Sequence, residues 1–236
     1  DSHYFGTIKE NVLGFMKELN IELWKLGIFA KTQHNEAAPS QYELATIHGN
    51  ANVSTDHNQL TMETLKRVAR HYNMECLLHE KPFKGVNGSG KHNNWSIITD
   101  SGKNLFSPGS NPHENTLFLF FITAVIKAVD ENSLLLRCAS SGPGNDCRLG
   151  GHEAPPGIIS IYLGDQIADI VEQIVNLGDA KTSKESDVLN TGVDTLPTLR
   201  KDATDRNRTS PFAFTGNKFE FRMVGSSVSI APTNTI

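Results

Sequence analysis

Apolar residues recur every three or four positions over residues 5–26, which is the repeat of an amphipathic helix. The residues at this spacing are Ile8, Val12, Phe15, Leu19 and Leu23. Gly27 follows them, and glycine is typical of the position just after a helix. The pattern therefore predicts a helix that ends at about residue 26.

Two short segments rich in β-forming residues come next, at 28–34 and 42–47. Each is typical of a strand. Residues 36–41 lie between them and include Pro39, which fits poorly inside a hydrogen-bonded ladder. We expect a bend there, between two strands.

Three further helices are predicted, at about 54–72, 115–129 and 158–177. The N-cap candidates of the first are Ser54, Thr55 and Asp56, and the positions expected on its buried face are Leu60, Leu65, Val68 and Ala69. The most apolar run, 117–126, is shorter than the roughly 20 residues that cross a bilayer. It predicts a core helix, and no membrane partner is expected.

The remaining segments predict strands and loops. Strands are expected at 74–78, 95–99 and 212–224, and a glycine-rich loop at 84–90. The stretch from about 178 to 205 is polar and poor in large apolar residues, which favours an inserted surface loop. Because strands and helices are mixed without strict βαβ alternation, the pattern favours an α+β fold.

Composition excludes some classes of partner. The chain of 236 residues has 22 Lys and Arg against 26 Asp and Glu, a net charge of -4, so it lacks the basic footprint of a nucleic-acid-binding protein. Its three cysteines follow no metal-binding spacing, and such a sparse, odd count favours a reducing compartment. We expect a cytoplasmic protein, with an organellar form as the alternative.

Two glutamates, Glu36 and Glu43, flank the predicted bend. Residues seven apart face opposite sides of a regular strand, but a bend at Pro39 can bring both carboxylates together. Converging carboxylates repel unless a cation lies between them, and oxygen ligands suit Mg²⁺ or Mn²⁺. Taken alone, two strand glutamates are also typical of a solvated edge.

The glycine loop has the spacing GxxxxGK from Gly85 to Lys91, as in a phosphate-binding P-loop. A P-loop continues with Ser or Thr and a helix. Here His92 and the poor helix formers at 93–95 follow, so we reject that interpretation. Either the loop is a simple turn, or its backbone approaches a small ligand closely with His92 as a metal ligand.

Two later segments carry charge. Residues 148–156 combine Arg148, two glycines, Glu153 and a double proline, which is typical of a mobile flap or of a surface turn. In the second, alternation places Lys218, Glu220 and Arg222 on one strand face, and Phe219 and Phe221 on the other. The aromatic face predicts core, and the charged face is either an ion-pair surface or the floor of a polar site.

In this order the segments resemble the glutamine synthetases. That family's catalytic domain carries Glu-x-x-Pro-x-Gln-x-Glu, Asn-Gly-Ser-Gly-x-His, an Arg-to-Glu flap, Asn-Arg, and Glu-x-Arg on a strand. The matching segments are Glu36–Glu43, Asn87–His92, Arg148–Glu153, Asn207–Arg208 and Glu220–Arg222. The resemblance runs from about residue 26 to 222. It implies a glutamine synthetase/guanido kinase-like catalytic domain, with a largely antiparallel sheet flanked by helices.

The resemblance also implies a role for each matching residue. The metal ligands would be Glu36 and Glu43 for one ion, and His92 and Glu220 for a second. The substrate-binding residues would be Asn87, Gly88, Arg148, Glu153, Arg208 and Arg222. The ATP-binding residues would be His34, Ser96 and Arg208, and the catalytic residues Glu153 and Arg208.

The implied reaction joins ammonia to L-glutamate with ATP as co-substrate. The glutamate γ-carboxylate attacks the γ-phosphoryl group of ATP, and ammonia then displaces phosphate from γ-glutamyl phosphate. Since two anions approach each other, Mg²⁺ or Mn²⁺ and arginines would neutralise the developing charge. A flap carrying Glu153 would exclude water from the acyl phosphate.

Departures from the common family pattern indicate its type III branch. The interval from Arg148 to Glu153 is one residue shorter, Asn94 stands where a second histidine is usual, and Ala213 replaces an expected arginine. An insert also separates Glu153 from Arg208. These differences bear most on the assignments of ATP contacts.

The family's active site needs further groups. They are a Glu-x-Glu strand upstream and an acidic loop from the β-rich N-terminal domain of a neighbouring subunit, which imply a homo-oligomer with inter-subunit sites. Neither segment lies before residue 26. We expect that residues 1–236 are part of one catalytic domain without the N-terminal domain, inactive alone and active in the full-length protein.

Two other functions remain as alternatives. One is a γ-glutamyl ligase that joins glutamate to a different amine. The other is a non-catalytic structural relative, which would be expected to lose metal ligands or the flap glutamate. The chain keeps Glu36, Glu43, His92, Glu153 and Glu220, which disfavours the second alternative.

Overall fold

A computed structural model describes residues 6–183, 188–189, 199–200 and 210–236. Contacts divide the chain into two units. The first joins Asp1–Lys91, Cys138–Ala154 and Met223–Ile236, and the second joins His92–Arg137 and Pro155–Arg222.

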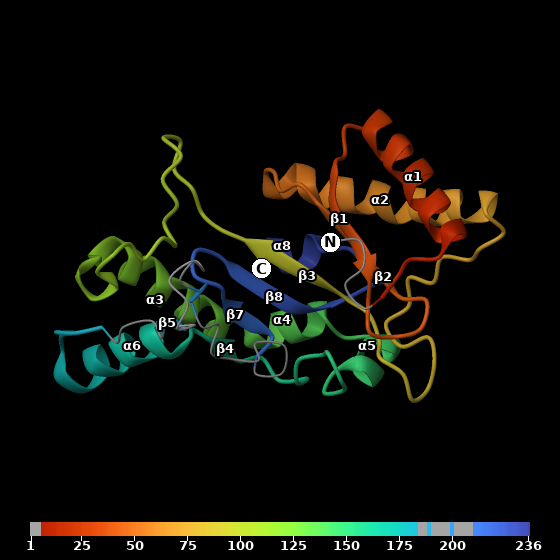
Figure 1. The fold of residues 1–236 in the computed structure, drawn as a ribbon. Coiled ribbons are helices and arrows are strands. Elements are labelled where there is room, and N and C mark those ends of the chain that lie inside the picture. The colour runs from red at the N-terminus through yellow and green to blue at the C-terminus, as the bar shows by residue number, and fades with distance from the viewer. Residues whose placement is uncertain (1–5, 184–187, 190–198, 201–209) are drawn as a thin grey trace. The chain divides into compact units, whose positions relative to one another are not determined.

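The first unit is built on two helices and a β-hairpin (Figure 1). In chain order they are α1 (Glu10–Lys25), β1 (Ala30–Asn35), β2 (Tyr42–Thr46) and α2 (Ala51–His71). Leu19, Leu23, Ile28 and Val68 form a core cluster with at most 1% of each residue exposed. Burying an aliphatic side chain of this size stabilises the fold by about 1.5–3 kcal/mol. The strand pair and the bend are confirmed, and the helix predicted over 5–26 is present but begins at Glu10.

The start of α2 was predicted wrongly. Asn50 is the N-cap, and its side-chain oxygen accepts a hydrogen bond from the Asn52 N–H at 3.0 Å. Thr55 lies inside the helix, where its hydroxyl donates to the Ala51 carbonyl at 2.7 Å. Leu60 is 39% exposed, whereas Val68 is fully buried, so the buried face was also predicted only in part.

Further segments of the first unit differ from the prediction. Residues 74–78 belong to no helix or strand, so the strand predicted there is wrong. Two short helices, α4 (Ser133–Ala139) and α5 (Pro143–Arg148), were not predicted, and neither was α8 (Ala231–Thr235). Of these, α4 begins in the second unit and ends in the first.

A four-stranded sheet has the order β3-β8-β7-β4. Its strands are β3 (Gly90–Trp95), β8 (Phe219–Gly225), β7 (Phe212–Phe214) and β4 (Ile161–Tyr162). The strand composition expected over 212–224 is confirmed, but the segment forms two strands: β7 and β8 make an antiparallel hairpin, and β4 pairs with β7 in parallel. The strand predicted at 95–99 is wrong in position, because β3 ends at Trp95 and only Ile98 makes an isolated bridge, to Asn104.

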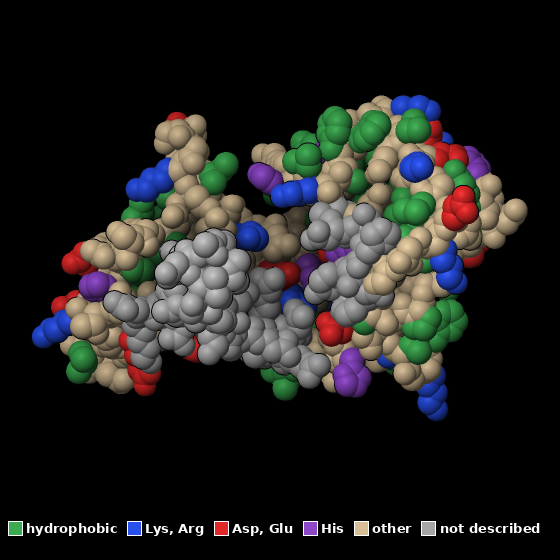
Figure 2. Space-filling model, viewed as in Figure 1, with side chains coloured by type: hydrophobic (Ala, Val, Ile, Leu, Met, Phe, Trp, Pro, Cys, Tyr) green, Lys and Arg blue, Asp and Glu red, His purple; other side chains and the backbone are tan. Residues whose placement is uncertain are grey.

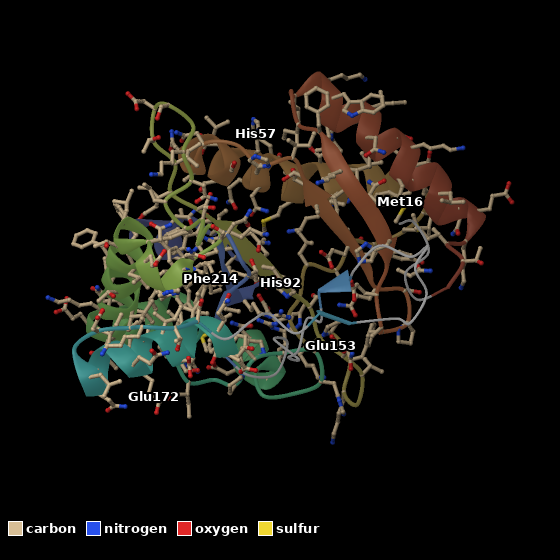
Figure 3. All side chains as sticks on the ribbon, turned by 60° about the vertical axis from the view of Figure 1, so that its left-hand side comes forward. Met16, His57, His92, Glu153, Glu172 and Phe214 are labelled. Carbon is tan, nitrogen blue, oxygen red and sulfur yellow. The ribbon has the colours of Figure 1, made fainter. Side chains whose placement is uncertain are left out.

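Helices pack beside the strands in the second unit. A short 3₁₀ turn, η1 (Pro112–Glu114), leads into α3 (Thr116–Glu131). The predicted N-terminus of α3 is confirmed, since the Asn115 side chain accepts a hydrogen bond from the Phe118 N–H at 3.1 Å. Phe214 lies against α3 (Figure 3), with its ring 5.9 Å from that of Phe118.

The helix predicted at 158–177 begins later than expected, as α6 (Asp165–Leu177). Ile161 and Tyr162 are strand residues instead, opposite Phe212 and Ala213 of β7. Gly164 has a φ of 79°, a left-handed conformation that ends the strand just before the helix.

Aromatic rings fill the space beside β8 in the second unit. Phe219 stacks on Trp95 at 5.6 Å and meets Phe106 edge-on at 5.1 Å. Phe221 packs on Phe212 at 4.5 Å. The prediction that Phe219 and Phe221 are core residues is confirmed, since both are fully buried.

Most of the polar stretch near 178–205 lies outside the described residues. Its described part includes β5 (Val188–Leu189) and β6 (Leu199–Arg200), which pair in antiparallel. The mixture of helices with mainly antiparallel strands confirms the α+β class. Within the described residues, no helix combines the length and apolar character that crossing a bilayer requires.

The surface of the first unit carries an apolar patch. Figure 2 shows hydrophobic side chains gathered over the carboxyl end of α1 and the loop that leads to β1. The exposed residues there are Ile21, Trp24, Leu26 and Phe29, each between 41% and 54% exposed. The carboxyl end of α1 is therefore apolar on both its buried and its exposed sides.

Candidate functional site

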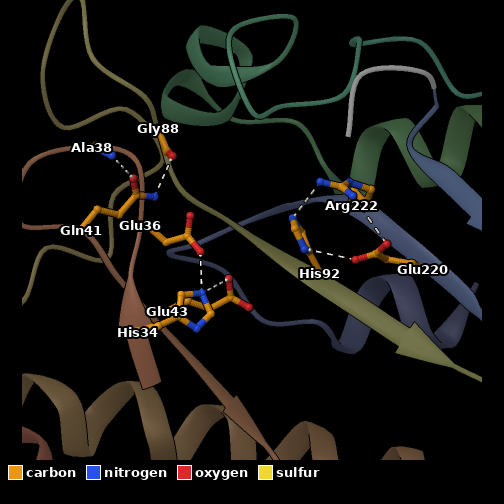
Figure 4. Close-up of polar contacts among 9 residues, drawn as sticks. All are labelled: His34, Glu36, Ala38, Gln41, Glu43, Gly88, His92, Glu220 and Arg222. Atoms are coloured by element: carbon orange, nitrogen blue, oxygen red, sulfur yellow. Dashed lines mark hydrogen bonds and ion pairs between the residues drawn. The ribbon is translucent and has the colours of Figure 1, made fainter. Parts of the chain in front are cut away.

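Two glutamates and a histidine meet at the end of the β1–β2 hairpin (Figure 4). His34 Nε2 lies 2.8 Å from Oε1 of Glu36 and 3.4 Å from Oε2 of Glu43. In the described part of the chain, this is the one cluster of three or more acidic, histidine or cysteine side chains with ligand atoms within 4.8 Å of one another. The predicted convergence of Glu36 and Glu43 is therefore present.

The register of the hairpin explains this convergence. His34 is paired directly with Glu43, and directly paired residues project from the same face. Glu36 is two residues after His34 and shares its face, because side chains alternate with a period of two. The turn between the strands is closed by the Glu36 N–H, which donates to the Gln41 carbonyl at 2.9 Å.

The donor set of this cluster suits a divalent ion. Two carboxylates supply hard oxygen ligands, which Mg²⁺ and Mn²⁺ prefer, and an imidazole is compatible with Mn²⁺. The side chains of His34 and Glu36 are 15% and 21% exposed, whereas that of Glu43 is 44% exposed. The cluster is thus partly buried and open on the side of Glu43. The prediction that His34 contacts ATP stays a prediction, and the structure places its ring against the two glutamates.

The glycine loop is tied to this hairpin. The Gln41 amide nitrogen donates to the Gly88 carbonyl at 3.0 Å, and its oxygen accepts from the Ala38 N–H at 3.2 Å. Asn87 and Gly88 are half-buried. After Gly90 the chain forms β3 rather than a helix, so the rejection of the P-loop interpretation is confirmed.

Arg148 lies on the glycine loop rather than in a surface turn. It ends α5 and is only 3% exposed, so the surface-turn interpretation is wrong for this residue. A β-carbon at Gly88 would come within 2.8 Å of its Cγ, and one at Gly90 within 2.5 Å of its guanidinium. The absence of side chains at these two glycines makes room for the arginine.

The end of the predicted flap is exposed. Glu153 is exposed and has a φ of 59°, a left-handed conformation that costs free energy in a residue other than glycine. Ala154, which follows it, is buried and only 3% exposed. Arg148 and Ala154 therefore fix the two ends of a short exposed segment that carries Glu153.

A second polar cluster lies on β3 and β8, in the second unit (Figure 4). His92 Nδ1 is 3.1 Å from Oε1 of Glu220, and Arg222 Nη1 is 3.5 Å from Oε2 of the same carboxylate. Arg222 Nη2 is 3.4 Å from His92 Nε2. Glu220 and Arg222 are buried, and the His92 side chain is 34% exposed. The charged face of β8 is thus not an exposed ion-pair surface.

The remaining predicted site residues are Ser96 and Arg208. Ser96 follows β3 directly and is exposed. Asn207 and Arg208 lie outside the described residues, so the catalytic and ATP-binding roles of Arg208 stay predictions.

Sequence reasoning missed a buried amide, Asn145. Its nitrogen donates to the carbonyls of Ser140 at 2.6 Å and Met223 at 2.8 Å, and its oxygen accepts from Arg148 Nε at 2.9 Å. Asn145 is 3% exposed. It therefore orients Arg148, and no pattern of spacing in the sequence indicates such a contact.

Two charged residues at the ends of the glycine loop were also missed. Glu80 is 5% exposed; burial raises the pKa of its carboxyl, but hydrogen bonds from Ser227 outweigh this, so the pKa lies below its ordinary value. Burial lowers the pKa of Lys91 to about 8, an effect that the nearby Glu80 charge opposes. Both residues contact segment 225–228, which begins at the last residue of β8.

Comparison with known families agrees with this arrangement of motifs. A family model described as "Glutamine synthetase, catalytic domain" matches residues 2–140. The chain belongs to the glutamine synthetase family.

Similar proteins carry the same name. The chain is 58% identical over 230 residues to a glutamine synthetase of Butyrivibrio fibrisolvens, covering 97% of the chain and 32% of that protein. It is 53% identical over 227 residues to a "Type-3 glutamine synthetase" of Dictyostelium discoideum, covering 96% and 31%. The predicted type III catalytic-domain segment is thereby confirmed, and the chain spans about a third of the length of these relatives.

Solved structures share the fold. "Apo GmaS without ligand" superposes with a TM-score of 0.62 at 16% identity, covering 94% of the chain and 42% of that structure. "GmaS/ADP complex-Conformation 1" gives the same TM-score and identity, covering 95% and 45%. At this identity the likeness concerns the fold alone.

Proposed function

We propose that the full-length protein containing this chain ligates ammonia to L-glutamate at the expense of ATP, through γ-glutamyl phosphate, and so assimilates nitrogen as glutamine. The observation that carries the proposal is the cluster of His34, Glu36 and Glu43 at the hairpin, in a chain of this family. Converged carboxylates are the arrangement that a divalent ion requires, and phosphoryl transfer requires such an ion.

The proposed metal ligands form two sets. Glu36 and Glu43 would hold one divalent ion, and His92 with Glu220 would contribute ligands to a second. Bound Mg²⁺ or Mn²⁺ would neutralise charge on the phosphoryl group. The donor sets fit such ions, because the first supplies two carboxylate oxygens and the second a carboxylate oxygen with an imidazole nitrogen.

The arginines and the glycine loop would bind the substrates. Arg148 lies beside Gly88 and Gly90, where a guanidinium and backbone groups suit recognition of a carboxylate. From its position on β8, Arg222 would neutralise negative charge on the transferred phosphoryl group. Arg208 would contact ATP and substrate, and His34 and Ser96 would lie toward the nucleotide.

Glu153 would act as the proton acceptor for the incoming ammonia. It is carried on an exposed segment whose ends are buried, which suits a flap that covers the acyl phosphate. The protein would be a cytoplasmic homo-oligomer, with part of each active site supplied by a neighbouring subunit.

The test is a coupled assay of the full-length protein with glutamate, ATP and Mg²⁺ or Mn²⁺, supplying ammonia or a series of larger amines. Ammonia-dependent release of ADP and phosphate with formation of glutamine is expected. Faster turnover with an alkylamine or polyamine would instead indicate a γ-glutamyl ligase for that amine. No turnover with any amine by folded, metal-loaded protein would contradict both.

The same assay applied to residues 1–236 alone is expected to give no turnover. The proposed reaction needs an upstream Glu-x-Glu strand and an acidic loop of a neighbouring subunit. Detectable γ-glutamyl transfer by the isolated, folded chain would contradict this requirement.

A further inference from the structure

Glu80 is a buried carboxylate outside the ligand clusters described above. Its Oε1 accepts hydrogen bonds from the backbone N–H of Ser227 at 2.9 Å and from the Ser227 hydroxyl at 2.5 Å. These bonds join two segments far apart in the sequence, because Ser227 follows β8. A buried carboxylate keeps its charge only with such donors, so this contact is specific rather than incidental.

Glycines surround the Glu80 side chain. A β-carbon at Gly225 would lie 2.5 Å from Glu80 Oε1, and one at Gly144 would lie 2.6 Å from Oε2. Glu80 therefore occupies a space that only glycine leaves open on two different segments. Gly144 belongs to α5, the helix that ends in Arg148.

The Glu80 backbone supports the glycine loop directly. The Ser89 N–H donates to the Glu80 carbonyl at 2.9 Å, and a β-carbon at Gly88 would lie 2.1 Å from the same oxygen. The Ser89 hydroxyl donates to the His79 carbonyl at 3.1 Å. The loop therefore rests on residues 79–80, whose position depends on the Glu80 side chain.

Lys91 closes the other end of the loop on the same segment. Its ammonium donates to the carbonyls of Gly225, Ser226 and Val228. Glu80 thus accepts hydrogen bonds from donors of segment 225–228, and Lys91 donates hydrogen bonds to carbonyl oxygens of the same segment. Together, Glu80 and Lys91 hold both ends of the glycine loop to one short segment. We call these two residues and their contacts with that segment the Glu80–Lys91 clamp.

We propose that Glu80 is a positioning residue: through the clamp it holds the glycine loop where Asn87 and Gly88 would meet glutamate. This inference rests on the proposed function, since it concerns the same substrate. Glu80 acts through the loop and through Ser227, and does not itself touch substrate.

The test compares full-length wild type with Glu80→Ala, Glu80→Gln and Ser227→Ala in steady-state kinetics. Glu80→Ala removes both hydrogen bonds, so KM for glutamate is expected to rise about tenfold while KM for ATP stays within about twofold. Glu80→Gln keeps an acceptor of the same size and is expected to restore KM for glutamate to within about threefold of wild type. Ser227→Ala, which removes one donor, is expected to lie between the two.

A merely structural role gives a different result. It would lower kcat with the active fraction of the enzyme and leave both KM values unchanged, and that outcome would overturn the proposal. If Glu80→Ala does not fold, Ser227→Ala decides: unchanged KM for glutamate in that variant contradicts the clamp.

A second readout separates this proposal from the proposed function. Hydrogen exchange of the peptide covering residues 87–91 is measured in full-length wild type and Ser227→Ala, with Glu172→Gln as the surface control. Faster exchange in Ser227→Ala alone is expected, and equal exchange in all three overturns the clamp. If wild type turns over glutamate with none of the amines, the proposed function and the glutamate-positioning role fail, while exchange still reports whether the clamp holds the loop.

Discussion

The Arg148 guanidinium lies so close to Gly90 that a β-carbon there would come within 2.5 Å of its central carbon. Since φ of Gly90 lies outside the left-handed region, this contact alone requires glycine. Arg148 is buried and held by Asn145, so it has little room to retreat.

We therefore expect Gly90→Ala in the full-length protein to displace Arg148. Overpacking of this kind costs about 1–3 kcal/mol of unfolding free energy. KM for glutamate should rise as well, because Arg148 is a proposed substrate ligand. Gly142→Ala is the matched control, since no atom lies within 4 Å of its added β-carbon; its change in unfolding free energy should stay below about 1 kcal/mol. Equal effects of the two substitutions would contradict the close contact.

Removing either carboxylate of the hairpin should weaken metal binding. Glu36→Gln and Glu43→Gln each replace a charged oxygen ligand by a neutral amide, and we expect Mn²⁺ affinity to fall about 10- to 100-fold or more. Titration followed by the electron paramagnetic resonance of free Mn²⁺ measures this directly. Glu172→Gln, an exposed position on α6, should bind as wild type does. Unchanged affinity in both hairpin variants would exclude a metal at this hairpin.

Asn145→Ala should destabilise the protein strongly. It removes three hydrogen bonds, to the buried carbonyls of Ser140 and Met223 and to Arg148 Nε, and a hydrogen bond contributes about 0.5–1.5 kcal/mol. Urea unfolding of full-length protein is expected to show a loss of about 2–4 kcal/mol. Asn111→Ala removes only an exposed contact to Glu114 and should change stability by less than about 0.5 kcal/mol. A loss for Asn145→Ala as small as that of Asn111→Ala would show that the buried amide is dispensable.

The pKa of Glu80 predicts how stability depends on pH. Because this pKa is lowered from an ordinary value of 4.5, the native state favours the carboxylate. Its stabilising contribution is therefore present above pH 4.5 and is lost as pH falls through the native pKa. Ser227→Ala removes one of the hydrogen bonds responsible, so its deficit in melting temperature should be largest near neutral pH and should shrink in acid. A deficit that is constant across this range would contradict the assignment.

The sequence predicts elements well where local chemistry decides them. The apolar repeat of α1 and the Asn115 cap of α3 depend on nearby residues alone. The hairpin was also predictable, because Pro39 interrupts two β-rich segments. In each case the intrinsic propensities, the apolar pattern and the residues that end or interrupt the element predict the same structure.

Two elements were predicted poorly, for different reasons. At the start of α2 several neighbouring residues have the composition of caps; Asn50 is the cap, and Thr55 bonds back to Ala51 inside the helix, as hydroxyl side chains do. β3 consists mostly of polar residues, and its place beside β8 depends on tertiary pairing rather than on its own pattern.

The same distinction applies to the candidate site. The family motifs predict Glu36, Glu43, His92 and Glu220 as site residues, because those residues lie in recognisable segments. Glu80 and Asn145 act through backbone groups of segments remote in sequence, and an isolated Glu or Asn carries no signal of that kind.

The hairpin turn between Asn35 and Tyr42 has a consequence for how its length can vary. Loops usually tolerate added or lost residues. Here, adding or removing one residue could shift the register of the strand pairing by one. Such a shift would turn Glu43 to the opposite face of β2, although His34, Glu36 and Glu43 would all still be present in the sequence. In related sequences, a gap in this turn should therefore be read as equivalent to a substitution of Glu43 itself. The proposed ligand pair therefore depends on the number of residues between the strands as much as on the two glutamates.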